Sequence, residues 1–362
     1  MITLPNIEIS FKQLAGSLIQ RSARGTAILI VRDNTDQTFD LKQYKNITAV
    51  GADADKYTAT NLQYIKDIFN FALNTVAVVR IGVEQTVSEA LNIIEHNIKT
   101  GWITVADGTT NDFSTLVSWI KSKESERKTY KAVVYNITVA PDCKHVVNFT
   151  NSKVTFADSR GEQTGEKYCP SLIGILASCN IERGSTYFEC SNLTHVEEVE
   201  NTGTAVQNGQ FVLINDIDRV LIALGVNSLT TTDGINLTED MKFIDIVEVM
   251  DLINDDISTV FKNEYLGKYK NNYDNQILFI SAINTYFISL ADDQILDNNY
   301  SNKADVDVEA QRQAWLGVGK TEAETWDDQT VKNNAFKRNV FLSGDIKING
   351  TIENLKFNVS LF

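Results

Sequence analysis

The run Thr26-Ala-Ile-Leu-Ile-Val31 decides the fold class of the first half of the chain. It is continuously apolar and rich in β-branched residues, which is typical of a strand buried on both faces of a sheet. Further short apolar runs follow it, separated by segments in which apolar residues recur at helical spacing. This alternation predicts βαβ units and a mainly parallel sheet with helices on both faces. The expected strands are 47–51, 76–81, 102–106 and 131–136, and the expected helices are 57–70, 88–99, one capped by Asn111 or Asp112, and 170–178.

The pattern changes after about residue 180, where strands and helices stop alternating. Just before this point, residues 146–149 and 154–156 predict an additional hairpin or edge pair. The long segment 239–265 carries a continuous apolar stripe with acidic residues opposite it, as an amphipathic helix does. The other elements expected in this half are a strand at 211–214, a short apolar segment at 221–225, and helices at 273–290 and 305–316.

Both ends of the chain have the alternating pattern of a strand with one buried face. The alternating apolar residues are Ile7, Ile9 and Phe11 at the start, then Ile346, Ile348 and Ile352 in one parity, and Leu355, Phe357, Val359 and Leu361 in the other. Chain ends usually fray unless something holds them. We therefore expect terminal strands that another chain can receive.

These patterns divide the chain into four parts. The expected parts are an N-terminal strand arm at 1–22, an α/β domain at 23–180, an α+β domain at 181–340 and a C-terminal strand arm at 341–362. A chain of 362 residues is long enough for two domains that each bury a core.

Composition excludes several classes of function. The formal net charge of −14 is unfavourable for direct nucleic-acid binding, which relies on Lys and Arg. No signal peptide is visible, and no apolar run approaches the roughly 20 residues of a membrane span. The four cysteines lack the paired spacing of metal ligands, so we expect buried free thiols in a reducing cytoplasm.

The sharpest enzyme signal is Gly51-Ala-Asp-Ala-Asp55 after an expected strand. It resembles the paired aspartates of haloacid-dehalogenase-type phosphotransferases, in which one carboxylate attacks phosphorus and both hold Mg²⁺. Tyr57 stands where that family has Thr or Val. The family also needs a downstream Lys and an acidic pair at a later strand end, whereas Asp292-Asp293 lies at the end of an expected helix. A phosphotransferase that uses Asp53 and Asp55 is therefore the alternative hypothesis.

Other chemical signals are weaker. Gly317-Val-Gly-Lys-Thr321 resembles the end of a phosphate-binding loop, but Ala314 replaces its first glycine and no strand precedes it. The three histidines have no partner at metal-ligand spacing. We therefore expect no catalytic residue, no cofactor and no metal.

The second half resembles the sheath subunit of contractile phage tails and related R-type bacteriocins. The motifs that carry this resemblance, in order, are Cys169-Pro-Ser-Leu-Ile-Gly-Ile-Leu-Ala177, Ser185-Thr-Tyr187, Gly209-Gln-Phe-Val-Leu213, Gly225-Val-Asn-Ser-Leu-Thr-Thr231, the helix at 242–253, Tyr265-Leu-Gly-Lys-Tyr-Lys-Asn-Asn272, Ser281-Ala-Ile-Asn-Thr-Tyr286, Asp307-Val-Glu-Ala-Gln311 and Leu355-Lys-Phe-Asn-Val359. Their order and spacing make the signal specific, and together they cover about residues 165–362.

The resemblance implies a structural, non-enzymatic subunit in stacked rings or a helical sheath around an inner tail tube protein. Its terminal arms would complete a small sheet in neighbouring copies, and contraction would drive the tube through a cell envelope. It implies baseplate and tail terminator proteins as further partners, with neither direct nucleic-acid binding nor membrane insertion. The expected location is a virion tail or bacteriocin particle assembled in the cytoplasm of the bacterial host.

A cluster of basic residues is the candidate contact with the tube. It comprises Lys332, Lys337 and Arg338, together with Arg312 and Lys320. The alternative is a solvated basic helix end. A third possibility for the whole chain is a non-contractile interaction module with the same fold, which would remain monodisperse.

Overall fold

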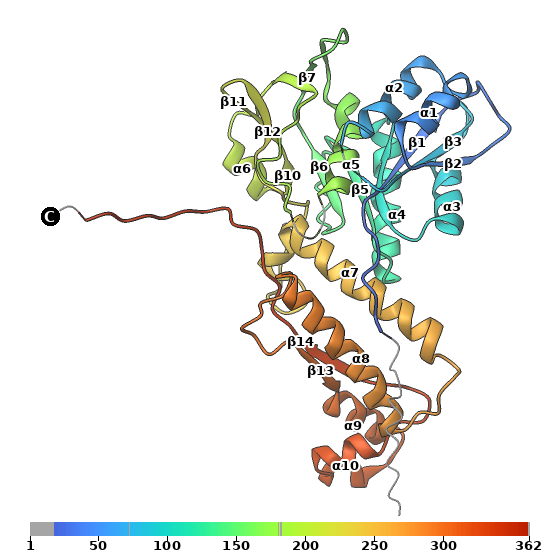
Figure 1. Ribbon diagram of the computed structural model, residues 1–362, viewed down its shortest axis with the longest axis vertical. Helices are drawn as coiled ribbons and strands as arrows, with labels where there is room; N and C mark the ends of the chain where they lie inside the picture. Colours follow the sequence, from blue (N-terminus) through green and yellow to red (C-terminus); the bar gives the residue numbers. More distant parts are fainter. Residues whose placement is uncertain (1–17, 72, 180, 182, 361–362) are drawn as a thin grey trace, which may run out of the picture. The chain divides into compact units, whose positions relative to one another are not determined.

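The protein is represented by a computed structural model that describes residues 18–71, 73–179, 181 and 183–360 (Figure 1). The described part forms two compact units. The larger unit contains residues 22–252 and 350–360, and the smaller contains residues 18–21 and 253–349. The predicted arm residues Ile7, Ile9, Phe11 and Leu361 lie outside the described residues.

A seven-stranded sheet forms the centre of the larger unit. Its strands, in spatial order, are β10 (Gln210–Phe211), β6 (Val146–Phe149), β5 (Tyr130–Tyr135), β4 (Gly101–Val105), β1 (Thr26–Arg32), β3 (Thr75–Ile81) and β2 (Leu41–Tyr44). All neighbouring pairs are parallel except β2 and β3, which are antiparallel. The predicted mainly parallel sheet is therefore confirmed.

Helices cover both faces of this sheet (Figure 1). They are α2 (Ala59–Ile68) and α5 (Cys169–Ser178) on one face, and α3 (Val87–Asn97) and α4 (Thr110–Ser125) on the other. In β1, Leu29 belongs to the core with α2 and α5, while Ile30 belongs to the core with α3 and α4. This alternation explains why the whole apolar run of β1 is buried. The side chain of Thr109 caps α4, in place of the predicted Asn111 or Asp112.

The predicted strand at 47–51 is wrong. These residues form helix α1 (Ile47–Ala52), which Asn46 caps by accepting a hydrogen bond from the Ala49 N–H. The 3₁₀ turn η1 (Ala54–Lys56) follows. A short apolar run does not distinguish a strand from a helix, and here a side-chain cap decides for the helix.

The predicted pairing of 146–149 with 154–156 is also wrong. β6 extends the parallel sheet beside β5, whereas β7 (Lys153–Phe156) pairs with β8 (Glu162–Thr164) and β9 (Leu193–Val196) in a separate antiparallel sheet. The backbone therefore leaves one sheet and enters another between the two runs.

Residues beyond 180 continue the larger unit. β10 pairs with β6, and the hairpin of β11 (Leu213–Asp216) and β12 (Arg219–Ile222) shares the core of α5. The predicted domain boundary at about residue 180 lies inside this unit, because long-range pairing joins the two segments. Its remaining short helices are η2 (Gly165–Tyr168), α6 (Thr202–Gln207) and η3 (Glu239–Lys242).

The predicted helical stretch at 239–265 is divided into η3, α7 (Ile244–Val260) and the π-helical turn η4 (Phe261–Tyr265). The boundary between the two compact units falls within α7.

The smaller unit contains α8 (Tyr273–Asp292), β13 (Lys303–Val306), α9 (Val308–Gly317), η5 (Thr321–Thr325), α10 (Asp328–Asn333) and β14 (Leu342–Asp345). The predicted helix at 305–316 begins only after β13, because Asp307 caps α9 by accepting from the Ala310 N–H. β13 and β14 form a two-stranded antiparallel sheet.

Candidate assembly interface

The C-terminal arm is the most exposed apolar segment of the described chain. The predicted arm at 341–362 begins with β14, and Ile348 then forms an isolated bridge with Leu296. Residues 349–360 form neither helix nor strand, and the name arm is used below for this segment. The arm runs outward as an extended chain (Figure 1). Its apolar side chains remain in solvent: Ile352 is 98%, Leu355 90%, Phe357 79% and Val359 65% exposed.

This exposure is unfavourable for an isolated subunit. Soluble monomers rarely leave contiguous apolar side chains uncovered, and such patches mark interaction sites. The alternation of Leu355, Phe357 and Val359 also requires a strand partner, which the described part of the subunit does not supply.

The two edges of the β13–β14 sheet differ. Asn284 of α8 accepts a hydrogen bond from the Ala304 N–H at 2.6 Å and donates one to the Ala304 carbonyl at 3.1 Å. The main-chain groups of Ala304 therefore point away from β14, toward a side chain that satisfies them. Gly344 lies opposite Ala304. In an antiparallel sheet, two opposite residues either both turn their N–H and C=O groups toward the partner strand or both turn them away from it. Because Ala304 turns its groups away from β14, Gly344 turns its groups away from β13. The edge of β14 is exposed at residues 343–345.

The structure divides the predicted basic cluster into two groups. Arg312 donates to two main-chain carbonyls of the following loop at 2.9 and 2.6 Å. The ammonium groups of Lys320 and Lys332 lie 3.0 and 2.6 Å from carboxylates of their own unit. Lys337 and Arg338 are exposed, and the described residues place no carboxylate within ion-pairing distance of either.

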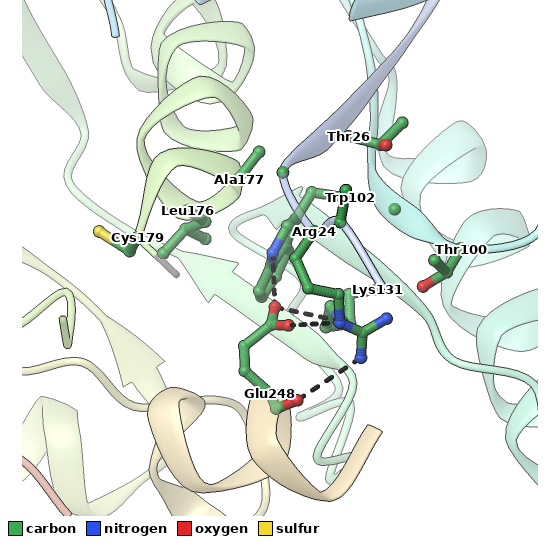
Figure 2. A pocket seen from close by; sticks show the side chains of 12 residues that line it. Arg24, Thr26, Thr100, Trp102, Lys131, Leu176, Ala177, Cys179 and Glu248 are labelled. Atoms are coloured by element: carbon green, nitrogen blue, oxygen red, sulfur yellow. Dashed lines mark hydrogen bonds and ion pairs between the residues drawn. The ribbon is translucent and has the colours of Figure 1, made fainter. Parts of the chain in front are cut away.

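A buried ionic cluster joins α7 to the central sheet (Figure 2). Lys131 of β5 is 3% exposed, and its ammonium lies 3.1 Å from both Glu248 and Asp251 of α7. The indole N–H of Trp102 in β4 donates to Glu248 at 2.9 Å. Arg24 adds a further positive charge, with Nε 4.0 Å from the Glu248 carboxylate.

His145 extends this cluster on the other side of Asp251. Its Nε2 lies 3.0 Å from Asp251, and its Nδ1 lies 2.9 Å from Glu124 of α4. The thiol of Cys143 also donates to Glu124, at 3.1 Å. Both ring nitrogens thus face carboxylate oxygens, an arrangement that only the doubly protonated imidazolium satisfies.

The electrostatics agree with this geometry. Burial disfavours a charged ring, but Asp251 and Glu124 outweigh it and raise the pKa of His145 to about 9. Burial likewise opposes ionisation of Glu124, yet His145 holds its pKa at about 2. Burial also acts on Asp251, but Lys131 and His145 keep the pKa of that carboxyl well below its usual range.

The sequence reasoning missed this cluster. It placed the acids of α7 opposite the apolar stripe, whereas Glu248 and Asp251 are 6% and 5% exposed. The available signal was Lys131, a cation within an otherwise apolar strand that must find a buried partner.

Known proteins that are similar to this chain are tail sheath proteins. Residues 237–362 match the model of the phage tail sheath C-terminal domain. Over 375 aligned residues, covering 100% of both chains, the sequence is 29% identical to the tail sheath protein of Clostridium phage phiCD119.

Residues 237–362 form a phage tail sheath C-terminal domain, and the whole chain is similar to a tail sheath protein.

Solved structures share the fold of this tail sheath protein. The contracted helical sheath of the anti-feeding prophage matches with a TM-score of 0.72 at 10% identity, over 99% of each chain. The sheath tail protein of Desulfitobacterium hafniense matches with a TM-score of 0.67 at 15% identity, over 83% of this chain and 94% of that one. The resemblance found in the sequence is therefore confirmed. As a tail sheath protein, the chain is a structural component of a phage tail or related particle.

The structure overturns the phosphotransferase alternative. Asp53 follows helix α1, so it does not lie at the carboxyl end of a buried parallel strand. Its carboxylate is bound by Lys42 at 2.6 Å and by the Tyr44 hydroxyl at 3.0 Å, and Lys42 lowers its pKa. Asp55 is exposed on η1. This pair is a helix end with a neighbouring turn.

The described residues of the sheath protein contain no group of three or more His, Cys, Asp or Glu side chains placed to hold a metal ion. None of their helices is long and apolar enough to cross a bilayer. All four cysteines, which are Cys143, Cys169, Cys179 and Cys190, are buried free thiols, and burial raises the pKa of each.

The buried imidazolium predicts a loss of stability at alkaline pH. Because the pKa of His145 is higher in the folded state than its ordinary value of 6.5, the stabilisation is complete below that value and is lost as pH rises through about 9. We expect the free energy of unfolding to fall by an amount on the order of 2 kcal/mol between pH 7 and pH 9. Urea denaturation across this range measures it.

His145→Gln should remove this pH dependence and destabilise the sheath protein at pH 6 by about 3–5 kcal/mol, because buried charges lose a partner. His96→Gln, at an exposed histidine of α3, is the matched control and should keep the wild-type slope. A wild-type slope in His145→Gln would contradict the assignment.

Proposed function

We propose that this tail sheath protein polymerises around an inner tail tube, as stacked rings or a helical sheath, and that contraction of the polymer drives the tube through a cell envelope. The observation that carries the proposal is an alternating apolar arm left in solvent, in a subunit whose small sheet has an uncovered edge. The particle is a virion tail or a bacteriocin, assembled in the host cytoplasm, with baseplate and tail terminator proteins at its ends. The proposal requires no cofactor and no catalytic centre.

The arm joins subunits by strand addition. Main-chain hydrogen bonds to a sheet edge supply the link, and side chains of one parity enter pockets. Burial of Leu355, Phe357 and Val359 contributes about 1.5–3 kcal/mol each before ordering costs are subtracted. Such a link can persist while the subunits move. Ile7, Ile9 and Phe11 form the corresponding N-terminal arm, and Leu361 completes the C-terminal one.

The edge of β14 is the acceptor in this proposal. Asn284 already satisfies the outward main-chain groups of Ala304 on β13, so that edge offers little to an incoming strand. On β14, Gly344 directs its main-chain groups outward within the exposed segment 343–345, and no described side chain covers them. Unpaired groups on an exposed edge are a template for another strand.

The tube contact is assigned to Lys337 and Arg338. Arg312, Lys320 and Lys332 are engaged within the subunit, so their charges are largely compensated. In a chain with a net charge of −14, two cations on one turn that have no carboxylate partner among the described residues form a local basic surface suited to an acidic partner.

The parity of the arm can be tested directly. A triple substitution to Asp at Leu355, Phe357 and Val359 should abolish tubes or rings in negative-stain microscopy, because charged side chains would have to enter apolar pockets. The same triple substitution at Lys356, Asn358 and Ser360 should preserve them. Deletion of residues 355–362 should leave folded monomers. Equal behaviour of the two triple variants would argue against one-faced strand addition.

The acceptor edge has its own test. Gly344→Pro removes an outward N–H, which an edge strand tolerates, so the subunit should fold and yet fail to form tubes. Gly344→Ala keeps the N–H, and an added Cβ would meet only atoms 3.8 Å away or farther. It should assemble as wild type. Wild-type tubes from Gly344→Pro, measured by sedimentation and microscopy, would exclude the edge of β14.

The tube contact predicts a salt-dependent loss. Lys337→Glu with Arg338→Glu should weaken co-sedimentation of sheath and tube by at least tenfold at low salt, and less at high salt, because screening reduces the repulsion. Lys121→Glu with Lys128→Glu makes the same charge change at exposed positions of the larger unit. This control should leave co-sedimentation unchanged, and an equal loss in both variants would point to net charge alone.

A further inference from the structure

The start of the C-terminal arm is held by the subunit itself. The N–H and the hydroxyl of Thr351 both donate to the same carboxylate oxygen of Asp245, at 3.0 and 3.1 Å. Asp245 lies in the first turn of α7. An exposed chain end thus begins with two hydrogen bonds to one charged group, and such charge-assisted bonds are stronger than neutral ones.

Glu353, two residues after Thr351, is held by a different segment of the larger unit, the loop that contains Thr186. The hydroxyl of Thr186 donates to Glu353 Oε1 at 2.6 Å and accepts from the Gly225 N–H at 2.9 Å. The Thr186 hydroxyl therefore both donates and accepts a hydrogen bond, and the bond from the Gly225 N–H holds its oxygen in place beside Glu353. Glu353 is only partly exposed, whereas the residues that follow it are exposed.

These contacts close a ring of hydrogen bonds around the start of α7. The carbonyl of Gly225 accepts from the Ile244 N–H at 3.0 Å, and the next residue is Asp245. Gly184 leaves the room that Thr351 occupies, because a Cβ at Gly184 would lie 2.7 Å from the Thr351 hydroxyl oxygen.

From this geometry we infer that Gly184, Thr186, Gly225 and Asp245 form a seat for the root of the arm, so that every subunit presents its exchanged strand from one point. The inference rests on the proposed function of the arm. It gives a physical role to the segments 185–187 and 225–231, which the sequence offered only as marks of resemblance.

The seat shortens the free tether of the arm. With Glu353 held, the tether that leads to Val359 is 354–359, which has 6 residues; with the seat lost, it is 350–359, which has 10. The effective concentration of a tethered strand falls roughly as the −3/2 power of tether length, so the loss is about twofold, in addition to the lost direction.

The seat can be tested on the isolated full-length subunit. A glutamate-specific protease that cleaves after Glu353 releases the peptide 354–362, which mass spectrometry quantifies. Thr186→Val removes both hydrogen bonds of the hydroxyl, and Gly184→Ala fills the space of Thr351. Each should accelerate release about tenfold, the effect of losing hydrogen bonds to a charged group. Amide exchange at Thr351 should accelerate to a similar degree.

Thr186→Ser keeps the hydroxyl and is the matched control, with release at the wild-type rate. Wild-type release from Thr186→Val and Gly184→Ala would overturn the seat, as would a tenfold acceleration in Thr186→Ser. Tube formation is scored separately. If wild-type subunits form no tubes, the proposed function fails while the protease result still decides the seat.

Discussion

The salt bridges of Lys131 with Glu248 and Asp251 are the interaction on which the functional parts of the larger unit depend. A lysine in the middle of a parallel sheet has no access to water, so its charge must be met by groups from outside the sheet. The two carboxylates are three residues apart on α7 and lie on the same side of the helix. They therefore determine both the position and the rotation of its first turns. Removal of one carboxylate would leave Lys131 with a single partner, and removal of both would leave its buried charge without either of these salt bridges.

The arm seat follows from the position of α7. Asp245 lies three residues before Glu248, so the contact that orients Glu248 toward β5 also places Asp245 near the end of the chain. Gly225 binds the first residue of α7 through its carbonyl, which connects the loop at Thr186 to the same helix. Helix α7 thus connects the buried ionic cluster with the start of the exposed arm. In the proposed sheath, a held start and a free end suit a strand that reaches another subunit and remains attached while that subunit moves.

Much of the architecture was visible in local sequence. The apolar run at 26–31 and its successors predicted the parallel sheet, which the structure confirms, whereas the terminal strand predicted from alternating apolar and polar residues stays a prediction. The same reasoning failed at 47–51, where the cap formed by Asn46 made a helix of a run that could equally have been a strand. It also failed for the acids of α7, since helical spacing shows which residues share a face but not what lies against that face. Among the predicted basic contacts, only the structure separated Lys337 and Arg338 from residues already bound within their own unit.

The features that the sequence predicts differ physically from those that only the tertiary structure decides. Strand and helix periodicity, the parity of Leu355, Phe357 and Val359, and the order of the family motifs depend on neighbours in the chain, and each can be read without knowing the fold. The pairing of β10 with β6, the burial of Glu248 and Asp251 against Lys131, the cover of β13 by Asn284 and the seat for Thr351 all join residues far apart in sequence. Such contacts exist only after the chain has closed long loops and the sheet has selected its neighbours, so they were decided by tertiary structure alone.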